Sequence, residues 1–222
     1  PLRYAGGKSK AYGFISTYIP FWPKPKRIIS PFIGGGSLEV RWANELDIEV
    51  IGYDVFDMLV NFWEVLLSQP QELSKELSKI TPDDNTYKEI KEILMSLDKT
   101  QDMLSDWKTD SYKREDVISL SDLERASLYY FNHNTSYGPG YLGWGSSVYL
   151  QADKWKQMCK NINNFKCGNL SVKQADYRDV IPNHKKDLLY LDPPYYLKKD
   201  TDNKMFKGIY PMRNIPVHHD GF

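Results

Sequence analysis

The chain has 222 residues, of which 41% are hydrophobic and 26% charged, and its formal net charge at pH 7 is zero. This composition excludes wholesale disorder, and a chain of this length can bury a large core without disulfide bonds. Its two cysteines exclude a disulfide scaffold and a four-cysteine zinc site, and no apolar run approaches the roughly 18 residues of a membrane span. We therefore expect a soluble intracellular protein with no membrane partner.

The first 68 residues predict helices and strands in alternation. A short helix over residues 9–19 ends at Pro20, and the β-branched run 27–33 predicts a buried strand. Three glycines, Gly34–Gly36, end that strand, and Ser37 is expected to cap the next helix. A second strand is expected over residues 47–53, followed by a largely apolar helix over residues 55–67.

Residues 69–164 differ in character and predict a mainly helical insertion. Residues 70–97 combine helical periodicity with many charges, and residues 98–120 are expected to be irregular. Ser121 and Glu124 fit a capping box at the start of a helix that reaches about residue 131. Residues 132–149 are rich in glycine and aromatic residues, which excludes a long regular element, and residues 153–162 predict another helix. We expect residues 1–68 and 165–222 to form one discontinuous domain around this insertion, the catalytic one.

Residues 170–174 and 187–191 predict two further strands in that domain. Strands that alternate with helices predict an α/β fold with a parallel sheet. The carboxyl ends of parallel strands meet at one edge of the sheet, and ligands bind there. Three features of the sequence fall at such ends, namely the glycine turn, Asp54 and Asp192.

The glycine turn and Asp54 together favour a nucleoside site. Glycines let the backbone approach a ligand, although a plain tight turn would use them equally well. Asp54 lies 20 residues after Gly34, where a carboxylate can accept hydrogen bonds from a ribose diol; its alternative role is to cap a helix. No Gly-Lys-Ser/Thr sequence follows the turn, and Glu39 stands where a dinucleotide fingerprint has its third glycine. An adenosine without a pyrophosphate therefore fits best.

The last predicted strand runs into the sequence Asp192-Pro193-Pro194-Tyr195. Prolines cannot continue the ladder of a strand, so they fix an extended turn with free carbonyl groups. The Asp192 carboxylate and the Pro193 carbonyl would be two acceptors side by side, as an exocyclic amino group requires. Tyr195 offers a face on which a base can stack. The alternative is a simple strand terminator.

The sequences YAGGKSK at 4–10, PFIGGGS at 31–37 and DPPY at 192–195, together with Asp54, resemble the Dam-like DNA adenine-N6 methyltransferases, in the order of their alpha group. The resemblance spans residues 1–195, with a weakly matched middle. It implies a Rossmann-like, S-adenosylmethionine-dependent methyltransferase sheet with S-adenosylmethionine as cofactor. The positions that match cofactor contacts of the family are Tyr4, Lys8, Phe32, Gly34, Gly36, Ser37, Asp54, Asp192 and, more loosely, Asp176.

The resemblance also implies methyl transfer to N6 of an adenine flipped out of double-stranded DNA. The acceptors of the DPPY sequence would aim the amine at the methyl group, so that catalysis rests on positioning and electrostatics. The catalytic residues are then Asp192, Pro193, Pro194 and Tyr195.

Residues 132–141 resemble the recognition loop of the same family, although His133 and Asn134 stand where an arginine is usual. Asn134, Ser136 and Tyr137 are the expected DNA contacts. The alternative is a loop whose glycines and aromatic residues serve structure alone. The insertion over residues 69–164 is accordingly expected to hold target recognition.

Two other functions stay open on the sequence. Transfer to cytosine N4 uses the same chemistry, but its motif begins more often with Ser, so Asp192 favours adenine. About 27 residues follow Tyr195, fewer than in most members of the family, so we expect a missing carboxyl-terminal part, and a non-catalytic DNA-binding module is the second alternative. The expected partners are double-stranded DNA and a companion restriction endonuclease; we expect a monomer and no metal.

Overall fold

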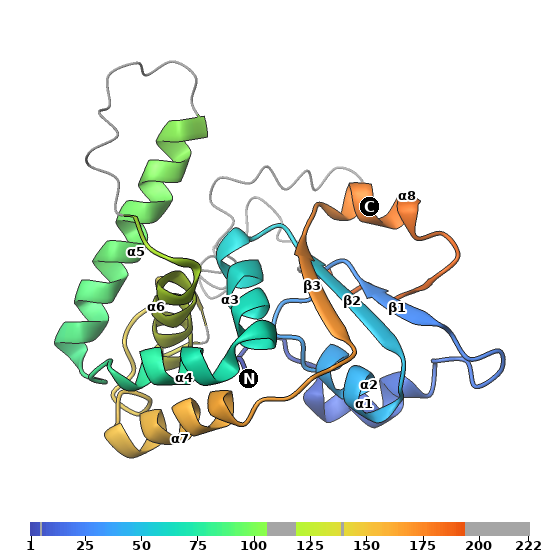
Figure 1. Ribbon diagram of the computed structural model, residues 1–222, viewed down its shortest axis with the longest axis horizontal. Helices are drawn as coiled ribbons and strands as arrows, with labels where there is room; N and C mark the ends of the chain where they lie inside the picture. Colours follow the sequence, from blue (N-terminus) through green and yellow to red (C-terminus); the bar gives the residue numbers. More distant parts are fainter. Residues whose placement is uncertain (5, 106–118, 139, 194–222) are drawn as a thin grey trace, which may run out of the picture.

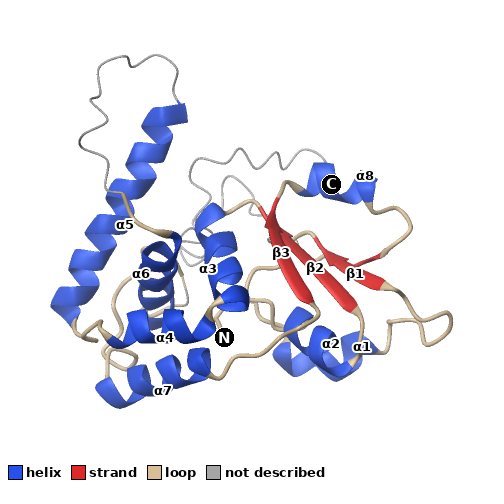
Figure 2. Cartoon of the chain, in the orientation of Figure 1, coloured by secondary structure: helices blue, strands red, loops and turns tan. Residues whose placement is uncertain are grey.

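A parallel β-sheet with helices on both faces forms one part of the molecule (Figures 1 and 2). The computed structural model describes residues 1–4, 6–105, 119–138 and 140–193, without the side chains of residues 98–105. Its four strands are ordered β3-β2-β1-β4, and each neighbouring pair is parallel, which confirms the predicted fold class. The strands are β1 Arg27–Ser30, β2 Glu49–Asp54, β3 Leu170–Gln174 and β4 Leu188–Leu189.

Both faces of the sheet are buried, which explains why β1 and β2 are continuous apolar runs rather than alternating ones. Ile28 and Val50 join the larger core, and their neighbours in sequence, Ile29 and Ile51, pack on the other face with Val180. The helices around the sheet are η1 Ser9–Ala11, α1 Tyr12–Ser16, α2 Glu39–Glu45, α3 Asp57–Ser68 and α8 Tyr177–Asn183. Of these, α8 had no counterpart among the predicted elements.

Four more helices gather on the side of α3 that faces away from the sheet (Figure 1). They are α4 Pro70–Ser78, α5 Asp84–Ser105, α6 Asp122–Thr135 and α7 Ala152–Asn163. Since α3 packs against both α6 and β3, it joins this helical region to the sheet. The domain boundaries at residues 68 and 165 stay a prediction.

The start of α6 confirms the capping box. The Ser121 hydroxyl accepts a hydrogen bond from the Glu124 N–H at 3.3 Å, and the Glu124 carboxylate accepts one from the Ser121 N–H at 2.8 Å. Two helices run further than predicted. Helix α5 continues to Ser105, where irregular chain was expected, and α6 continues to Thr135, so that the first residues of the expected recognition loop are helical.

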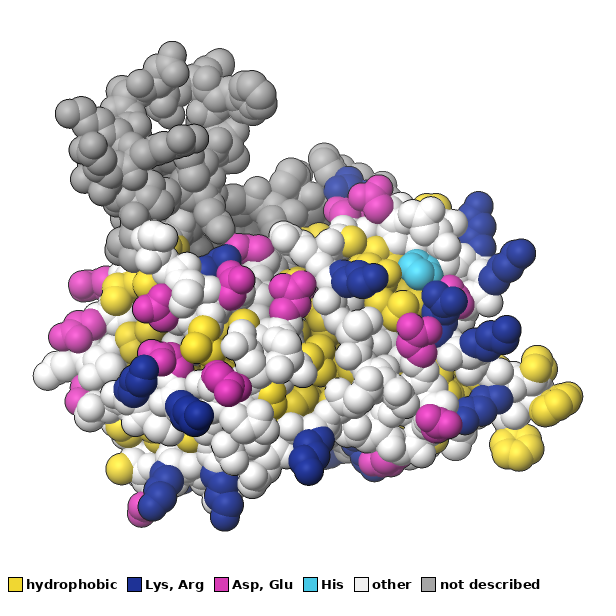
Figure 3. All heavy atoms as spheres, in the orientation of Figure 1, with side chains coloured by type: hydrophobic (Ala, Val, Ile, Leu, Met, Phe, Trp, Pro, Cys, Tyr) yellow, Lys and Arg dark blue, Asp and Glu magenta, His cyan; other side chains and the backbone are white. Residues whose placement is uncertain are grey.

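Acidic and basic side chains are interspersed on the face of the molecule shown in Figure 3. Within the described part of the chain, no helix combines the length and the apolar character that crossing a bilayer requires.

Candidate active site at the carboxyl edge of the sheet

The glycine turn, Asp54 and Asp192 meet at one edge of the sheet, because the strands that precede them are parallel neighbours. Strand β1, which leads into the turn, is hydrogen-bonded to β2 on one side and to β4 on the other. Asp54 is the last residue of β2, and Asp192 follows β4, whose pairing continues as the Tyr190 N–H donates to the Ile29 carbonyl at 2.8 Å. The two carboxylates therefore flank the turn.

The glycine turn has a backbone that only glycine adopts easily. Gly34 and Gly36 have φ values of +47° and +59°. A Cβ atom on Gly36 would lie 2.6 Å from Cζ2 of Trp63, and one on Gly34 would lie 2.9 Å from Cε1 of Tyr4. The Trp63 indole N–H also donates to the Gly34 carbonyl at 3.0 Å. The turn thus needs its glycines for its own packing against Tyr4 and Trp63, besides any approach of a ligand.

Ser37 has a different partner from the one expected, so the prediction that it caps a helix is wrong. The residue before α2 is Leu38, and no side chain caps this seven-residue helix. Instead, the Ser37 hydroxyl accepts a hydrogen bond from the backbone N–H of Lys8 at 3.1 Å. Ser37 therefore attaches the amino-terminal segment to the glycine turn.

Asp54 does not cap α3, because the N-cap residue of that helix is Phe56 and no side chain caps it; its contact with a ribose stays a prediction. Its carboxylate accepts hydrogen bonds from the Phe56 N–H at 3.1 Å, near the start of α3, and from the Gly34 N–H at 3.3 Å, in the turn. Burial raises its pKa to about 6, because these hydrogen bonds offset only part of the cost of desolvating the charge. Two carboxylate oxygens accept about four hydrogen bonds, so capacity remains for the hydroxyl groups of a ribose.

Lys8 joins the glycine turn to Asp192. Its ammonium group donates to the two Asp192 carboxylate oxygens at 2.6 and 2.8 Å and to the Gly6 carbonyl at 2.9 Å. The Tyr190 hydroxyl donates to the same carboxylate at 3.3 Å. The Lys8 and Asp192 side chains are 29% and 32% exposed, so the pair is reachable from solvent. The backbone N–H of Lys8 is hydrogen-bonded to Ser37 and its ammonium group to Asp192. Lys8 therefore spans the space between the glycine turn and the start of the DPPY sequence.

Asn134 and Ser136 lie inside the molecule, which corrects the expectation that they contact DNA. They are 1% and 0% exposed. The Asn134 side chain accepts from the Arg3 N–H at 2.8 Å, and the Arg3 guanidinium donates to the Asn134 and Ser136 carbonyls at 2.6 and 3.0 Å. His133 is buried as well, with its ring stacked on Tyr4. These residues hold the amino-terminal segment in place.

Tyr137, the third expected DNA contact, is exposed and has an aromatic neighbour. Its N–H donates to the Trp144 carbonyl at 2.7 Å, beside an antiparallel bridge between Ser136 and Gly145. The Tyr137 and Trp144 side chains are 81% and 84% exposed. We call residues 136–145 the aromatic hairpin; residue 139 lies outside its described part. Trp144 was missed in the sequence, although its position between two glycines is a signal of an exposed turn.

Phe32, Tyr177 and Asp176 form a further group at the edge. The rings of Phe32 and Tyr177 lie 5.3 Å apart. The Asp176 carboxylate caps α8 by accepting from the Arg178 N–H at 2.8 Å and pairs with the Arg178 guanidinium at 2.7 Å, and this bonding lowers the pKa of Asp176. A contact between Asp176 and a cofactor stays a prediction.

The DPPY sequence is described only in part. Asp192 and Pro193 are half-buried at the edge, and Pro194 and Tyr195 lie outside the described residues. The stacking role expected for Tyr195 is therefore not placed.

The parallel sheet, with the glycine turn, Asp54 and Asp192 at its carboxyl edge, is consistent with the Rossmann-like methyltransferase class. The family model of the D12 class N6 adenine-specific DNA methyltransferases matches residues 4–216. The chain therefore belongs to this family. No curated protein matches it.

Family membership establishes the function at the level of the reaction. The chain is an adenine-specific DNA methyltransferase, a transferase whose family uses S-adenosylmethionine to methylate N6 of adenine in DNA. The alternative of transfer to cytosine N4 is not supported. Asp192, which favoured adenine over cytosine in the sequence, agrees with this assignment.

Proposed function

We propose that the carboxyl edge of the sheet binds S-adenosylmethionine across the glycine turn and presents Asp192 to the target amine. The bound cofactor would supply a methyl group made electrophilic by its sulfonium. Asp54 would accept hydrogen bonds from the ribose, and the turn from Gly34 to Ser37 would border the methionine part. Phe32, which precedes the turn, would also border the methionine part, and Asp176 and Tyr177 would lie near the adenine.

The donor and acceptor groups of the edge support this placement. Asp54 keeps free lone pairs, and burial has raised its pKa, so hydroxyl donors would stabilise its charged form. The backbone of the turn carries no Cβ atoms over three consecutive positions. The side chain of Tyr4 packs against Gly34 and Gly35 and fills the space that their Cβ atoms would take.

In the proposed reaction, the Asp192 carboxylate and the Pro193 carbonyl accept the two N–H bonds of a flipped-out adenine amine. This directs the nitrogen lone pair at the methyl group. Lys8 pairs with the Asp192 carboxylate and fixes its direction, and the hydroxyl of Tyr190, the residue after β4, donates a further hydrogen bond to it. The observation that carries the proposal is the span of Lys8 from Ser37 to Asp192, because it brings the cofactor turn and the acceptor within the reach of one side chain.

Substitution of Asp192 tests the proposal. We expect Asp192→Ala to lower methyl transfer to DNA by about 10²-fold or more, the size of effect found when a transition-state contact is removed. The unfolding temperature should change little, since the side chain is partly exposed. The measurement is transfer of a labelled methyl group to DNA, with donor binding followed separately by titration.

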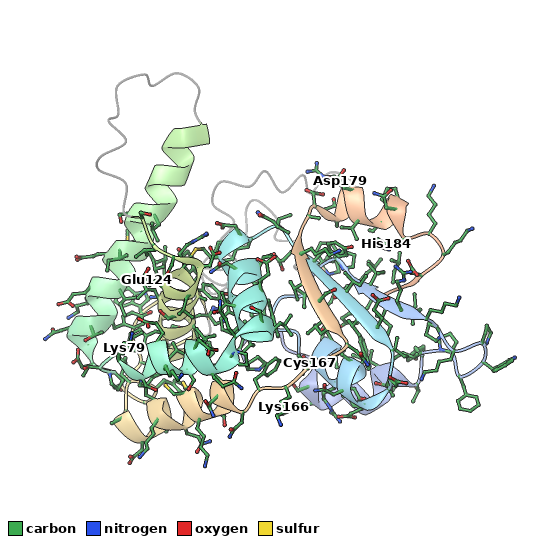
Figure 4. The ribbon with its side chains drawn as sticks, viewed as in Figure 1. Lys79, Glu124, Lys166, Cys167, Asp179 and His184 are labelled. Carbon is green, nitrogen blue, oxygen red and sulfur yellow. The ribbon has the colours of Figure 1, made fainter. Side chains whose placement is uncertain are left out.

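Asp179→Ala is the matched control, because Asp179 is exposed on α8 near the same edge (Figure 4). It should keep full activity. An active Asp192→Ala variant contradicts the catalytic assignment. A wild-type chain that binds DNA but transfers no methyl group supports instead the alternative of a non-catalytic DNA-binding module.

We further propose that the enzyme acts as a monomer, inside the cell where its target DNA lies, and beside a companion restriction endonuclease. Restriction-modification is typical of the family. Molar mass in solution tests the first point. Protection of methylated DNA from cleavage by an endonuclease encoded beside the gene tests the last.

A further inference from the structure

Glu39 is a buried carboxyl group that the reaction described above does not use. It is the first residue of α2 and is 3% exposed. One carboxyl oxygen lies 2.7 Å from the hydroxyl of Ser30, and the other accepts from the Leu38 N–H at 3.2 Å. Ser30 is the last residue of β1 and is itself fully buried. Glu39 therefore links the end of β1, four residues before the glycine turn, to Leu38, which follows the turn and Ser37.

The surroundings of Glu39 favour its uncharged form. No Lys, Arg or His pairs with it among the described residues. A buried carboxylate without a cation is costly. The charged group that acts on it from outside its own helix is Asp192, whose negative charge also opposes ionisation; the ammonium of Lys8 is already paired with Asp192. Burial, and to a lesser degree Asp192, raise the pKa of Glu39 to about 7.

We propose that Glu39 is a positioning residue that, as a neutral acid, holds the cofactor turn closed between Ser30 and Leu38. This inference rests on the proposed function, since it assigns the turn to the cofactor. As a charged carboxylate, Glu39 accepts from both the Ser30 hydroxyl and the Leu38 N–H. Once it is protonated, its O–H donates to the Ser30 oxygen instead, while its other oxygen still accepts from the Leu38 N–H.

Two substitutions separate the neutral acid from a charged one. In Glu39→Gln, the amide N–H can donate to Ser30 and the amide oxygen can accept from Leu38, as the neutral acid does. Glu39→Ala removes both contacts. Glu45→Gln is the control, because Glu45 lies on the same helix, is exposed, and pairs with Arg41 at the surface.

The readouts are equilibrium binding of S-adenosylmethionine and thermal unfolding, each measured between about pH 6 and pH 8.5. We expect Glu39→Gln to bind the donor within about twofold of wild type at the acidic end, and Glu39→Ala to bind it about tenfold more weakly, with DNA affinity unchanged. Wild type should lose donor affinity as the pH rises through about 7, and Glu39→Gln should not. Glu45→Gln should follow wild type throughout.

The stability of the protein should depend on pH in the same direction as donor binding. A carboxyl group whose pKa is raised in the folded state stabilises the protein below its unfolded pKa, and this contribution is lost as the pH rises through about 7. The unfolding temperature of Glu39→Gln should therefore exceed that of wild type at pH 8.5.

Three results would overturn the inference: a Glu39→Gln variant as defective as Glu39→Ala, a Glu39→Ala variant with normal donor affinity, or parallel unfolding curves for wild type and Glu39→Gln across the pH range. A wild-type chain that binds no donor would instead reject the proposed function, and it would do so without any variant.

Discussion

Two carboxyl groups at the edge of the sheet have different environments and, we propose, different tasks. Asp54 is bonded to backbone N–H groups and has a pKa raised by burial, whereas Asp192 is held by the ammonium of Lys8 and is partly exposed. The first environment suits a group that binds hydroxyl donors. The second suits a fixed acceptor beside an open space.

At this scale, donor binding should depend on pH through Asp54. Its pKa of about 6 means that the carboxylate is charged above this pH and becomes protonated below it. Since the charged form is the better acceptor for a ribose diol, we expect affinity for S-adenosylmethionine to fall as the pH drops below about 6. Asp54→Asn should bind about tenfold or more weakly at neutral pH and lose this acidic dependence.

Calorimetric titration with S-adenosylmethionine checks the prediction, with Asp47→Asn as the control, since Asp47 lies at the surface before β2. A wild-type affinity that stays constant down to pH 5 would contradict the ribose role of Asp54.

At the scale of elements, the end of α6 and the aromatic hairpin differ in exposure: the residues at the end of α6 are buried, whereas two side chains of the hairpin are exposed. The last turn of α6 buries Asn132, His133 and Asn134, and burial lowers the pKa of His133 to about 4, which keeps its ring neutral at physiological pH. A neutral, buried ring cannot replace the arginine usual at this place in a contact with phosphate. The hairpin that follows exposes Tyr137 and Trp144, and we propose that these two aromatic side chains contact the DNA.

We expect Tyr137→Ala and Trp144→Ala each to weaken DNA binding by about tenfold, because base–aromatic stacking contributes roughly 1–3 kcal/mol per base. Donor affinity should not change, since neither side chain lies at the glycine turn. Fluorescence anisotropy with a DNA duplex gives the measurement.

Tyr18→Ala is a suitable control, because Tyr18 is 71% exposed just after α1. If both hairpin variants bind DNA as wild type does, the aromatic hairpin has no role in recognition.

At the scale of the whole molecule, the first eight residues connect the two parts of the structure. Arg3 is bonded to the end of α6 and lies over the ring of Tyr149 at 3.4 Å. Tyr4 lies between His133 and the glycine turn, and Lys8 reaches Asp192. A short segment therefore links the end of α6 to the carboxyl edge of the sheet.

Loosening this segment should affect both binding functions together. We expect Arg3→Ala to reduce donor affinity and DNA affinity by about fivefold or more each, and to lower stability by about 1–3 kcal/mol, the cost of leaving buried carbonyls unpaired. Arg41→Ala removes a guanidinium that also lies 3.4 Å over a tyrosine ring, at the surface of α2, and should change neither affinity. An Arg3→Ala variant that loses only one affinity would contradict the coupling.

The order of elements, the parallel sheet and the placing of the glycine turn, Asp54 and Asp192 at one edge followed from the sequence by itself. Apolar runs, glycines and prolines act locally, and parallel strands end at a common edge whatever surrounds them. Only the tertiary structure decided which side chains are exposed and which are buried. Asn134 and Ser136 are buried by Arg3, which is more than 130 residues away in the chain, and Ser37 bonds to Lys8 instead of capping a helix. Such contacts depend on the folded arrangement of distant segments, so no local pattern of residues encodes them.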